Sequence, residues 1–93
     1  MTTIIIRHSV QDFDTWKRGY DEADALRVQH GITYASIHRD AQDPNTVFAV
    51  HQFPDSRSAQ AFMAAVPPAM EKAGVVGQPE VWIGEDIETN TYG

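Results

Sequence analysis

Histidine is the residue type in this sequence best suited to acid–base chemistry, and it occurs at His8, His30, His38 and His51. An imidazole with an ordinary pKa of about 6.5 exchanges its proton close to neutral pH, so it can act as a general acid or base. His30 stands beside Gly31 at the expected end of a helix, where a histidine commonly interacts with the helix dipole. The other three occur on expected strands, and we predict His51, His38 and His8 as the catalytic candidates.

Other polar and aromatic side chains could assist a histidine in such a site. Tyr34 can donate a hydrogen bond, and Arg39 or Arg7 can stabilise an oxyanion. Trp82 offers a flat wall for an aromatic substrate. Each also has a plainer interpretation, because Arg39 could pair only with a neighbouring aspartate and Trp82 could be an ordinary core residue.

The sequence excludes several kinds of site. It has no cysteine, which rules out disulfides, thiolate metal ligands and a cysteine nucleophile. It has no glycine-rich phosphate loop or dinucleotide fingerprint, so we expect no cofactor. A metal site built from histidines and a carboxylate is an alternative, but no tight ligand spacing such as His-x-His occurs, and we assign no metal ligand.

Length and charge limit the domain organisation and the partners. A chain of 93 residues predicts a single domain, residues 1–93. Its 13 acidic and 7 basic residues give a net charge of −6, which disfavours binding to nucleic acid or to an anionic membrane. No apolar run approaches the roughly 20 residues of a membrane span, and the first residues do not form a basic leader. We therefore expect a cytoplasmic protein that binds neither nucleic acid nor membrane.

The hydrophobic pattern predicts four strands and two helical regions. Alternating and β-branched runs predict strands over residues 2–9, 32–39, 46–53 and 80–84. Apolar residues three and four apart predict a helix of about 15 residues that follows Asp12 and ends at Gly31. A second helix follows Asp55 and is broken at Pro67-Pro68 before a short helical piece. Residues 75–79 are expected to form a connector, and residues 85–93 a polar C-terminal tail.

This order of elements, β-α-β-β-α-β, predicts a ferredoxin-like α+β fold with a four-stranded antiparallel sheet and both helical regions on one face. The hairpin between the second and third strands decides which side chains share a face. If Arg39 pairs with Thr46, side-chain alternation places seven residues together: Tyr34, Ser36, His38, Val47, Ala49, His51 and Phe53. The opposite face, with Ile37, Phe48 and Val50, is then the expected helix-covered core.

The first of these faces mixes apolar and polar residues, as ligand pockets do. We expect it to bind a hydrophobic small molecule, with Phe53, Ser36, Trp82 and Arg7 as substrate-binding residues. A second copy of the chain could wall this face off, so we predict a homodimer that encloses a barrel-like cavity.

Three segments carry a family resemblance. They are His8–Lys17 (His-Ser-Val-Gln-Asp-Phe-Asp-Thr-Trp-Lys), the hairpin Asp43-Pro44-Asn45, and Ala73–Gly77 followed by Pro79-Glu80-Val81. With these segments the chain, from about residue 4 to about residue 88, resembles the dimeric α+β barrel superfamily, and within it small bacterial proteins grouped with antibiotic biosynthesis monooxygenase-like domains.

That superfamily includes cofactor-independent oxygenases acting on aromatic polyketides, polyketide cyclases, lactone isomerases, haem-degrading enzymes and members without a known activity. The resemblance implies a cofactor-independent monooxygenase, or a cyclase or isomerase, that acts on an aromatic, polyketide-like small molecule by acid–base catalysis. A non-catalytic ligand-binding or stress-response dimeric barrel and a histidine-based metal-dependent enzyme are the alternatives. Relatives commonly carry Ser-Pro-Glu-Leu after the second helix, near the pocket mouth, where this chain has Val66-Pro67-Pro68-Ala69.

Overall fold

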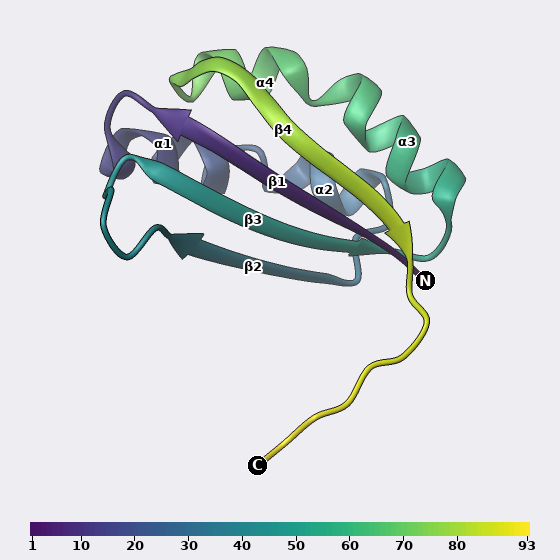
Figure 1. The fold of residues 1–93 in the computed structure, drawn as a ribbon. Coiled ribbons are helices and arrows are strands. Elements are labelled where there is room, and N and C mark those ends of the chain that lie inside the picture. The colour runs from purple at the N-terminus through teal and green to yellow at the C-terminus, as the bar shows by residue number, and fades with distance from the viewer.

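Four antiparallel strands and four helices make up the computed structural model, which describes residues 1–93. The strands β1 (Thr2–Val10), β2 (Tyr34–Arg39), β3 (Thr46–Phe53) and β4 (Val75–Glu85) form one sheet in the order β2-β3-β1-β4. The helices α1 (Phe13–Glu22), α2 (Asp24–Gln29), α3 (Ser56–Ala65) and α4 (Pro67–Lys72) all lie on the same side of this sheet (Figure 1). The predicted ferredoxin-like α+β fold is therefore confirmed.

Two aspartates fix the starts of the longer helices, as the sequence predicts. Asp12 has extended backbone geometry, and its Oδ2 accepts a hydrogen bond from the backbone N–H of Thr15 at 3.0 Å. Asp55 accepts one from the backbone N–H of Ser58 at 2.8 Å. Such N-caps satisfy amide groups that have no partner within the first helical turn, and α1 and α3 begin directly after them.

The long helix expected after Asp12 is divided at Ala23 into α1 and α2. Ala23 departs from helical geometry, with φ −90° and ψ 9°, and its N–H bonds to two carbonyl oxygens of the preceding turn. The break comes after Trp16 and Tyr20, the aromatic residues of α1 that pack against His8 and His51 of the sheet. The apolar periodicity alone gives no signal for such a break.

The last strand is longer than predicted. Residues 75 and 76, expected in a connector, pair with Val10 and Ser9 and form the first part of β4. The pairing between β1 and β4 shifts between Arg7 and Ser9. This irregularity lies beside His8, and β-bulges are often found next to functional sites because they re-aim a side chain.

The register of the β2–β3 hairpin differs by one residue from the predicted register. Arg39 pairs with Val47 rather than with Thr46. The loop stabilises this pairing, because Oδ2 of Asp40 accepts hydrogen bonds from two backbone N–H groups of the loop, each at 2.9 Å. Since side chains alternate along a strand, a shift of one residue exchanges the faces of one strand relative to the other.

The helix-covered face consequently differs from the predicted one. Among its buried residues are Ile4 and Ile6 of β1 and Val47, Ala49, His51 and Phe53 of β3. Phe62 of α3 packs against this cluster. Ile37 shares this face, as expected, whereas Phe48 and Val50 lie on the opposite, open face of the sheet and are only partly buried.

The open face exposes large apolar side chains in the single chain. Trp82 is 53% exposed, Tyr34 51% and Ile5 41%. The run Ile4-Ile5-Ile6 predicts a strand covered on both sides, but helices cover only one side of it. The second side of the sheet therefore has no covering layer within this chain.

The C-terminal segment starts from the open face and leaves the sheet. Asp86 is anchored there, because its backbone N–H bonds to the carbonyl of Met1 at 2.9 Å and its carboxylate accepts hydrogen bonds from Thr3 and Gln52. The following residues, Ile87–Gly93, extend away without regular structure (Figure 1). None of the helices is both long enough and apolar enough to cross a membrane.

Candidate functional site

A small, partly open cavity of about 40 Å³ lies between the helix-covered face of the sheet and the helices. Ile6 and His8 of β1 and Ala49 and His51 of β3 line it on the sheet side. Tyr20 of α1, Arg27 of α2 and several residues of α3 and α4 line it on the helix side. We call this the inner cavity, and it is mostly apolar apart from the two histidines, the tyrosine and the arginine.

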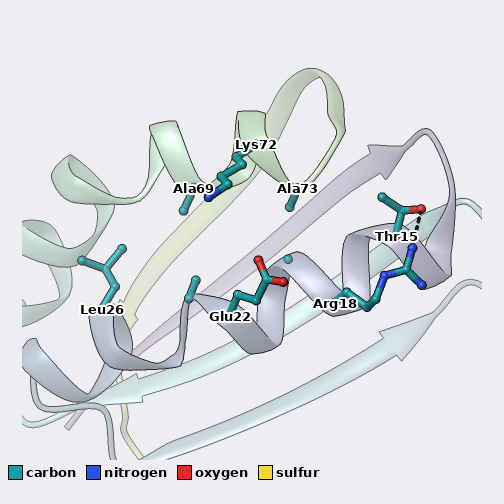
Figure 2. Close-up of a pocket in the computed structure, with 9 residues that line it drawn as sticks. Thr15, Arg18, Glu22, Leu26, Ala69, Lys72 and Ala73 are labelled. Carbon is teal, nitrogen blue, oxygen red and sulfur yellow. Dashed lines mark hydrogen bonds between the residues drawn. The ribbon is translucent and has the colours of Figure 1, made fainter.

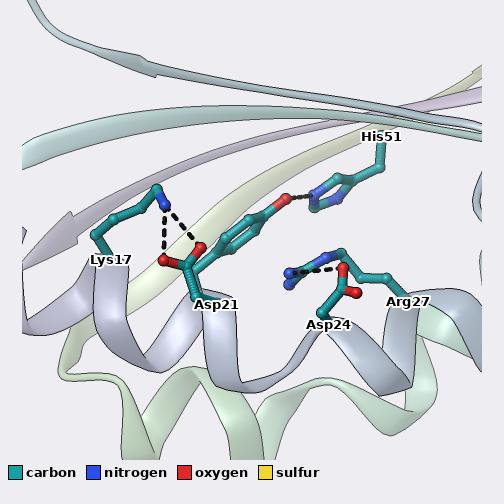
Figure 3. Close-up of polar contacts among 6 residues, drawn as sticks. Lys17, Asp21, Asp24, Arg27 and His51 are labelled. Atoms are coloured by element: carbon teal, nitrogen blue, oxygen red, sulfur yellow. Dashed lines mark hydrogen bonds and ion pairs between the residues drawn. The ribbon is translucent and has the colours of Figure 1, made fainter.

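His51 is the best-placed titratable group of the inner cavity. It is 3% exposed, and its Nε2 forms a 2.9 Å hydrogen bond with the hydroxyl of Tyr20 (Figure 3). The two rings are stacked, with centroids 5.9 Å apart, and Phe62 meets the imidazole edge-on at 5.6 Å. Its Nδ1 is buried without a hydrogen-bond partner in the protein. This nitrogen is therefore free to bond to a ligand.

Burial controls the protonation of these groups. It lowers the pKa of His51 from 6.5 to about 4, and the positive charge of Arg27 and the neighbouring His8 act in the same direction. Burial is also the largest cause of the raised pKa of Tyr20. At neutral pH the imidazole is therefore neutral and the phenol keeps its proton. The hydrogen bond between them joins two uncharged groups.

Arg27 brings a positive charge to the edge of the inner cavity. Arg27 is 6% exposed, and its guanidinium carbon lies 3.7 Å from the centroid of the Tyr20 ring. Its carboxylate partner is Asp24, at 3.3 Å, whose own side chain is 69% exposed (Figure 3). Because water screens that carboxylate more than the buried guanidinium, the inner cavity favours an anion.

His8 is the second buried imidazole that faces the helices. It is 6% exposed, and neither ring nitrogen has a hydrogen-bond partner in the protein. Its ring packs 5.4 Å from the ring of Trp16, and burial lowers its pKa. Ile4 lies opposite His51 in the sheet, so the Cα atoms of the two histidines are about 13 Å apart along the strands. The two imidazoles lie toward opposite ends of the inner cavity.

A buried polar nitrogen without a partner costs on the order of 1–3 kcal/mol. Native structures retain such groups only where strain, a chemical role or a bound water, ion or ligand accounts for them. Three of them occur here, and they belong to the two histidines that line the same cavity. This concentration of unpaired nitrogens marks the inner cavity as the candidate site.

Most other predicted site residues lie on the opposite, open face of the sheet. His38 and Ser36 bond to each other there at 2.9 Å, and Arg7 forms an ion pair with Glu80 at 2.5 Å. Tyr34 and Trp82 are on the same face and are half exposed. The expectation that His38 and His51 share a cavity is wrong, because the observed hairpin register places them on opposite sides of the sheet.

Two further predicted residues lie on the helix-covered side but not in the inner cavity. Phe53 is fully buried in the core next to Phe62. The guanidinium of Arg39 lies over the ring of Phe13 at 4.2 Å, and its Nε donates to the carbonyl of Pro44 at 3.3 Å. These contacts are structural, and neither side chain reaches His51.

Tyr20 and Arg27 are site residues that the sequence analysis did not select. The signal for Arg27 is its spacing, because it stands seven residues after Tyr20 and so falls on the same helical face. A charged residue at such an apolar position usually has a special environment. The hydrogen bond to His51 requires the tertiary structure.

The structure also bears on the metal alternative. Nowhere does it bring together three or more histidine, aspartate or glutamate side chains in an arrangement that could hold a metal ion. His38 and His51 point to opposite sides of the sheet, so these two histidines cannot bind one ion together.

Several solved structures share this fold over nearly its whole length. The cofactor-independent oxygenase SnoaB from Streptomyces nogalater matches with a TM-score of 0.78 at 14% identity, covering 95% of this chain and 94% of that chain. A second match is a monooxygenase from the gene ActVA-Orf6 of Streptomyces coelicolor, solved with the ligand nanaomycin D. Its TM-score is 0.67 at 14% identity, and the match covers 99% of this chain and 92% of that chain. A Nitrosomonas europaea protein assigned to the antibiotic biosynthesis monooxygenases matches with a TM-score of 0.73 at 16% identity, and the match covers 95% of this chain and 100% of that chain.

No protein-family model matches the sequence, and no curated protein shows significant sequence similarity to it. The structural matches establish the class of fold: the chain has the α+β fold of the antibiotic biosynthesis monooxygenase-like proteins. This confirms the fold that the sequence resemblance implies.

Proposed function

We propose that this protein is a cofactor-independent oxygenase that acts on a flat, phenolic small molecule bound in the inner cavity. The observation that carries the proposal is the set of unpaired nitrogens of His8 and His51, buried in an otherwise apolar cavity beside the cation Arg27. The fold it shares with a cofactor-independent oxygenase and a monooxygenase supports this reaction class.

His51 acts as the base in the proposed reaction. Its pKa of about 4 keeps the imidazole neutral at pH 7, and an anion that forms beside it raises that pKa, since an opposite charge favours the protonated form. Arg27 stabilises the same anion. Tyr20 acts as a positioning residue, because its hydroxyl fixes the plane of the imidazole through Nε2.

The proposed oxygenation balances without a bound cofactor. His51 takes a proton from a ring CH₂ that lies beside a phenolic ring, which leaves an electron-rich anion. This anion reduces O₂, and a C–O bond forms to give a hydroperoxide. Loss of water, with the proton returned from His51, leaves a ring C=O, so that one CH₂ and one O₂ become one C=O and one H₂O. The apolar walls keep bulk water from protonating the anion first.

The test measures oxygen uptake with hydroxyanthrones, which carry a ring CH₂ beside a phenolic ring, as probe substrates. We expect His51→Ala to lower turnover by about 10²- to 10⁴-fold, and His51→Gln to do the same while keeping a side chain of similar volume. His38→Ala, on the open face, serves as the matched control and keeps the wild-type rate. Unchanged turnover in His51→Ala and His8→Ala together would overturn the proposal. Product formation without oxygen uptake would replace it by a cyclisation or isomerisation at the same residues.

We further infer that a second copy of the chain covers the open face of the sheet. Ile5 and Trp82 lie side by side there in paired strands, and both remain exposed in the single chain. Exposed apolar patches of this kind are typical of interaction surfaces. Trp82→Lys is expected to convert a dimer into a monomer in light scattering, whereas Ile87→Lys in the extended tail keeps the dimer. A monomeric wild-type protein would contradict this inference.

A further inference from the structure

The inner cavity is too small to hold an aromatic substrate as it stands. Its volume is about 40 Å³, whereas small-molecule sites usually measure about 300–1,000 Å³. A larger groove of about 400 Å³ runs along the outside of the molecule between α1 and α4, and we call it the outer groove (Figure 2).

The two hollows meet at a seam between helices. Four residues line both of them: Gly19 and Ala23 on the side of α1, and Ala69 and Ala73 on the side of α4. They are the smallest residue types, so few side-chain atoms lie between the outer groove and the inner cavity. At the tightest point, a Cβ atom built on Gly19 would stand 2.7 Å from the Cβ of Ala73.

The α4 side of the seam is the more weakly held wall. None of the six residues of α4 is buried, and no side chain caps its N-terminus. Pro67 and Pro68 interrupt the helical hydrogen bonds between α3 and α4. Gly74, with φ +89°, ends the segment on the other side. Ala69 and Met70 pack against the core and Ala73 is buried in it, so these are the contacts that a movement of α4 away from α1 has to break.

The outer groove carries two cations that have no acidic partner. Arg18 and Lys72 line it, and neither forms an ion pair, a property they share with Arg39 and Arg57 elsewhere in the chain. Arg18 donates a 3.3 Å hydrogen bond to the hydroxyl of Thr15 and contributes to the lowered pKa of Asp12 without contacting it. Glu22 is the one acidic residue of the groove (Figure 2). In a protein of net charge −6, a groove with an excess of free cations is notable.

We propose that the inner cavity and the outer groove form one substrate site for a flat aromatic molecule that carries a carboxylate. The ring enters the inner cavity when α4 moves away from α1, and the carboxylate stays in the outer groove beside Arg18 and Lys72. This inference rests on the proposed function, since the reacting part of the ring must reach His51. It adds the substrate class and the route of entry, and the two cations of the groove outnumber its one carboxylate, Glu22.

The first experiment measures binding of two probes that differ only in charge, 2-naphthol and 6-hydroxy-2-naphthoate, by calorimetry. We expect the wild-type protein to bind the carboxylate about five- to tenfold more tightly, which corresponds to two partly screened ion pairs. The double variant Arg18→Gln/Lys72→Gln loses this preference and keeps its affinity for the naphthol. The double variant Lys17→Gln/Arg57→Gln has the same net charge and retains the preference.

The outcomes separate this inference from the proposed function. Binding of neither probe would argue against an aromatic site at all, and both proposals would fail together. Equal binding of the two probes to the wild type, or a preference that survives in Arg18→Gln/Lys72→Gln, would overturn this inference alone. An equal loss of preference in the charge-matched control would show a general charge effect and would also overturn it.

The second experiment tests the movement of α4. Because the chain has no cysteine, Gly19→Cys/Ala73→Cys creates a single possible disulfide across the seam. The two Cβ atoms need to move apart by only about 1 Å to reach the spacing of about 3.8 Å that a disulfide requires. We expect the oxidised variant to bind 2-naphthol at least about tenfold more weakly than the same protein after reduction. Equal binding in the two redox states would overturn the proposed entry route.

Discussion

The buried, neutral state of His51 predicts a pH-dependent stability that can be calculated from its pKa. In the folded protein this pKa is about 4, whereas in the unfolded chain it is about 6.5. Between these two values the unfolded chain binds the proton and the folded protein does not. The free energy of unfolding is therefore highest above pH 6.5 and decreases as the pH falls toward 4. The loss attributable to His51 is about 2 kcal/mol at pH 5 and about 3 kcal/mol at pH 4.

Urea denaturation at pH 7 and pH 5, at one fixed protein concentration, measures this loss. His51→Gln cannot take up a proton, so its change in unfolding free energy between the two pH values should be smaller than that of the wild type by about 2 kcal/mol. Comparing each variant with itself cancels any constant loss caused by the substitution. His38→Gln, at an exposed position on the open face, should keep the wild-type change.

Other titrating groups do not mask the contribution of His51 to the change in unfolding free energy between pH 7 and pH 5. Burial lowers the pKa of His8 as well, which adds to the loss in the same direction and persists in His51→Gln. Asp12, Asp40 and Asp55 have pKa values lowered mainly by backbone hydrogen bonds, so their contribution is lost only below about pH 3.8. If His51→Gln shows the same decrease between pH 7 and pH 5 as the wild type, the buried neutral imidazole is refuted.

Two further predictions concern the seam and the hydrogen bond of the site. Gly19→Ala should lower the free energy of unfolding by about 1–3 kcal/mol, because its methyl group collides with Ala73. Gly93→Ala, in the extended tail, adds a methyl group that meets nothing within 4 Å and should change it by less than about 0.5 kcal/mol. Equal losses in the two variants would show that α1 and α4 are not in close contact. Tyr20→Phe leaves Nε2 of His51 buried without a partner and should cost about 1–3 kcal/mol in thermal or urea unfolding; a neutral result would show that the hydrogen bond does not form.

The sequence predicts the elements of this fold well because each element leaves a local signature. Asp12 and Asp55 are placed directly before apolar residues with helical spacing, and both act as N-caps. Pro67-Pro68 divides the second helical region as expected. The start of β4 at Val75 leaves no such local signature, because it depends on pairing with a strand more than sixty residues away in the sequence.

The candidate site is predicted only in part, for a related reason. His51 and His8 are selected by residue type, and both line the inner cavity. His38 is selected by the same criterion but lies on the other side of the sheet. Tyr20 is assigned to an ordinary helix face by its periodicity and Arg27 is not selected, although both line the helix side of the site.

The sequence by itself determines the order of strands and helices, the helix caps and the chemistry available, which is that of histidine, tyrosine and arginine without cysteine. The tertiary structure decides which of these groups meet. The physical reason lies in the β2–β3 hairpin. Its loop is held by the hydrogen bonds of Asp40, and Arg39 pairs with Val47 instead of with Thr46, a register shifted by one residue. Because side chains alternate along a strand, that single residue places His51 under the helices with Tyr20 and leaves His38 on the open face.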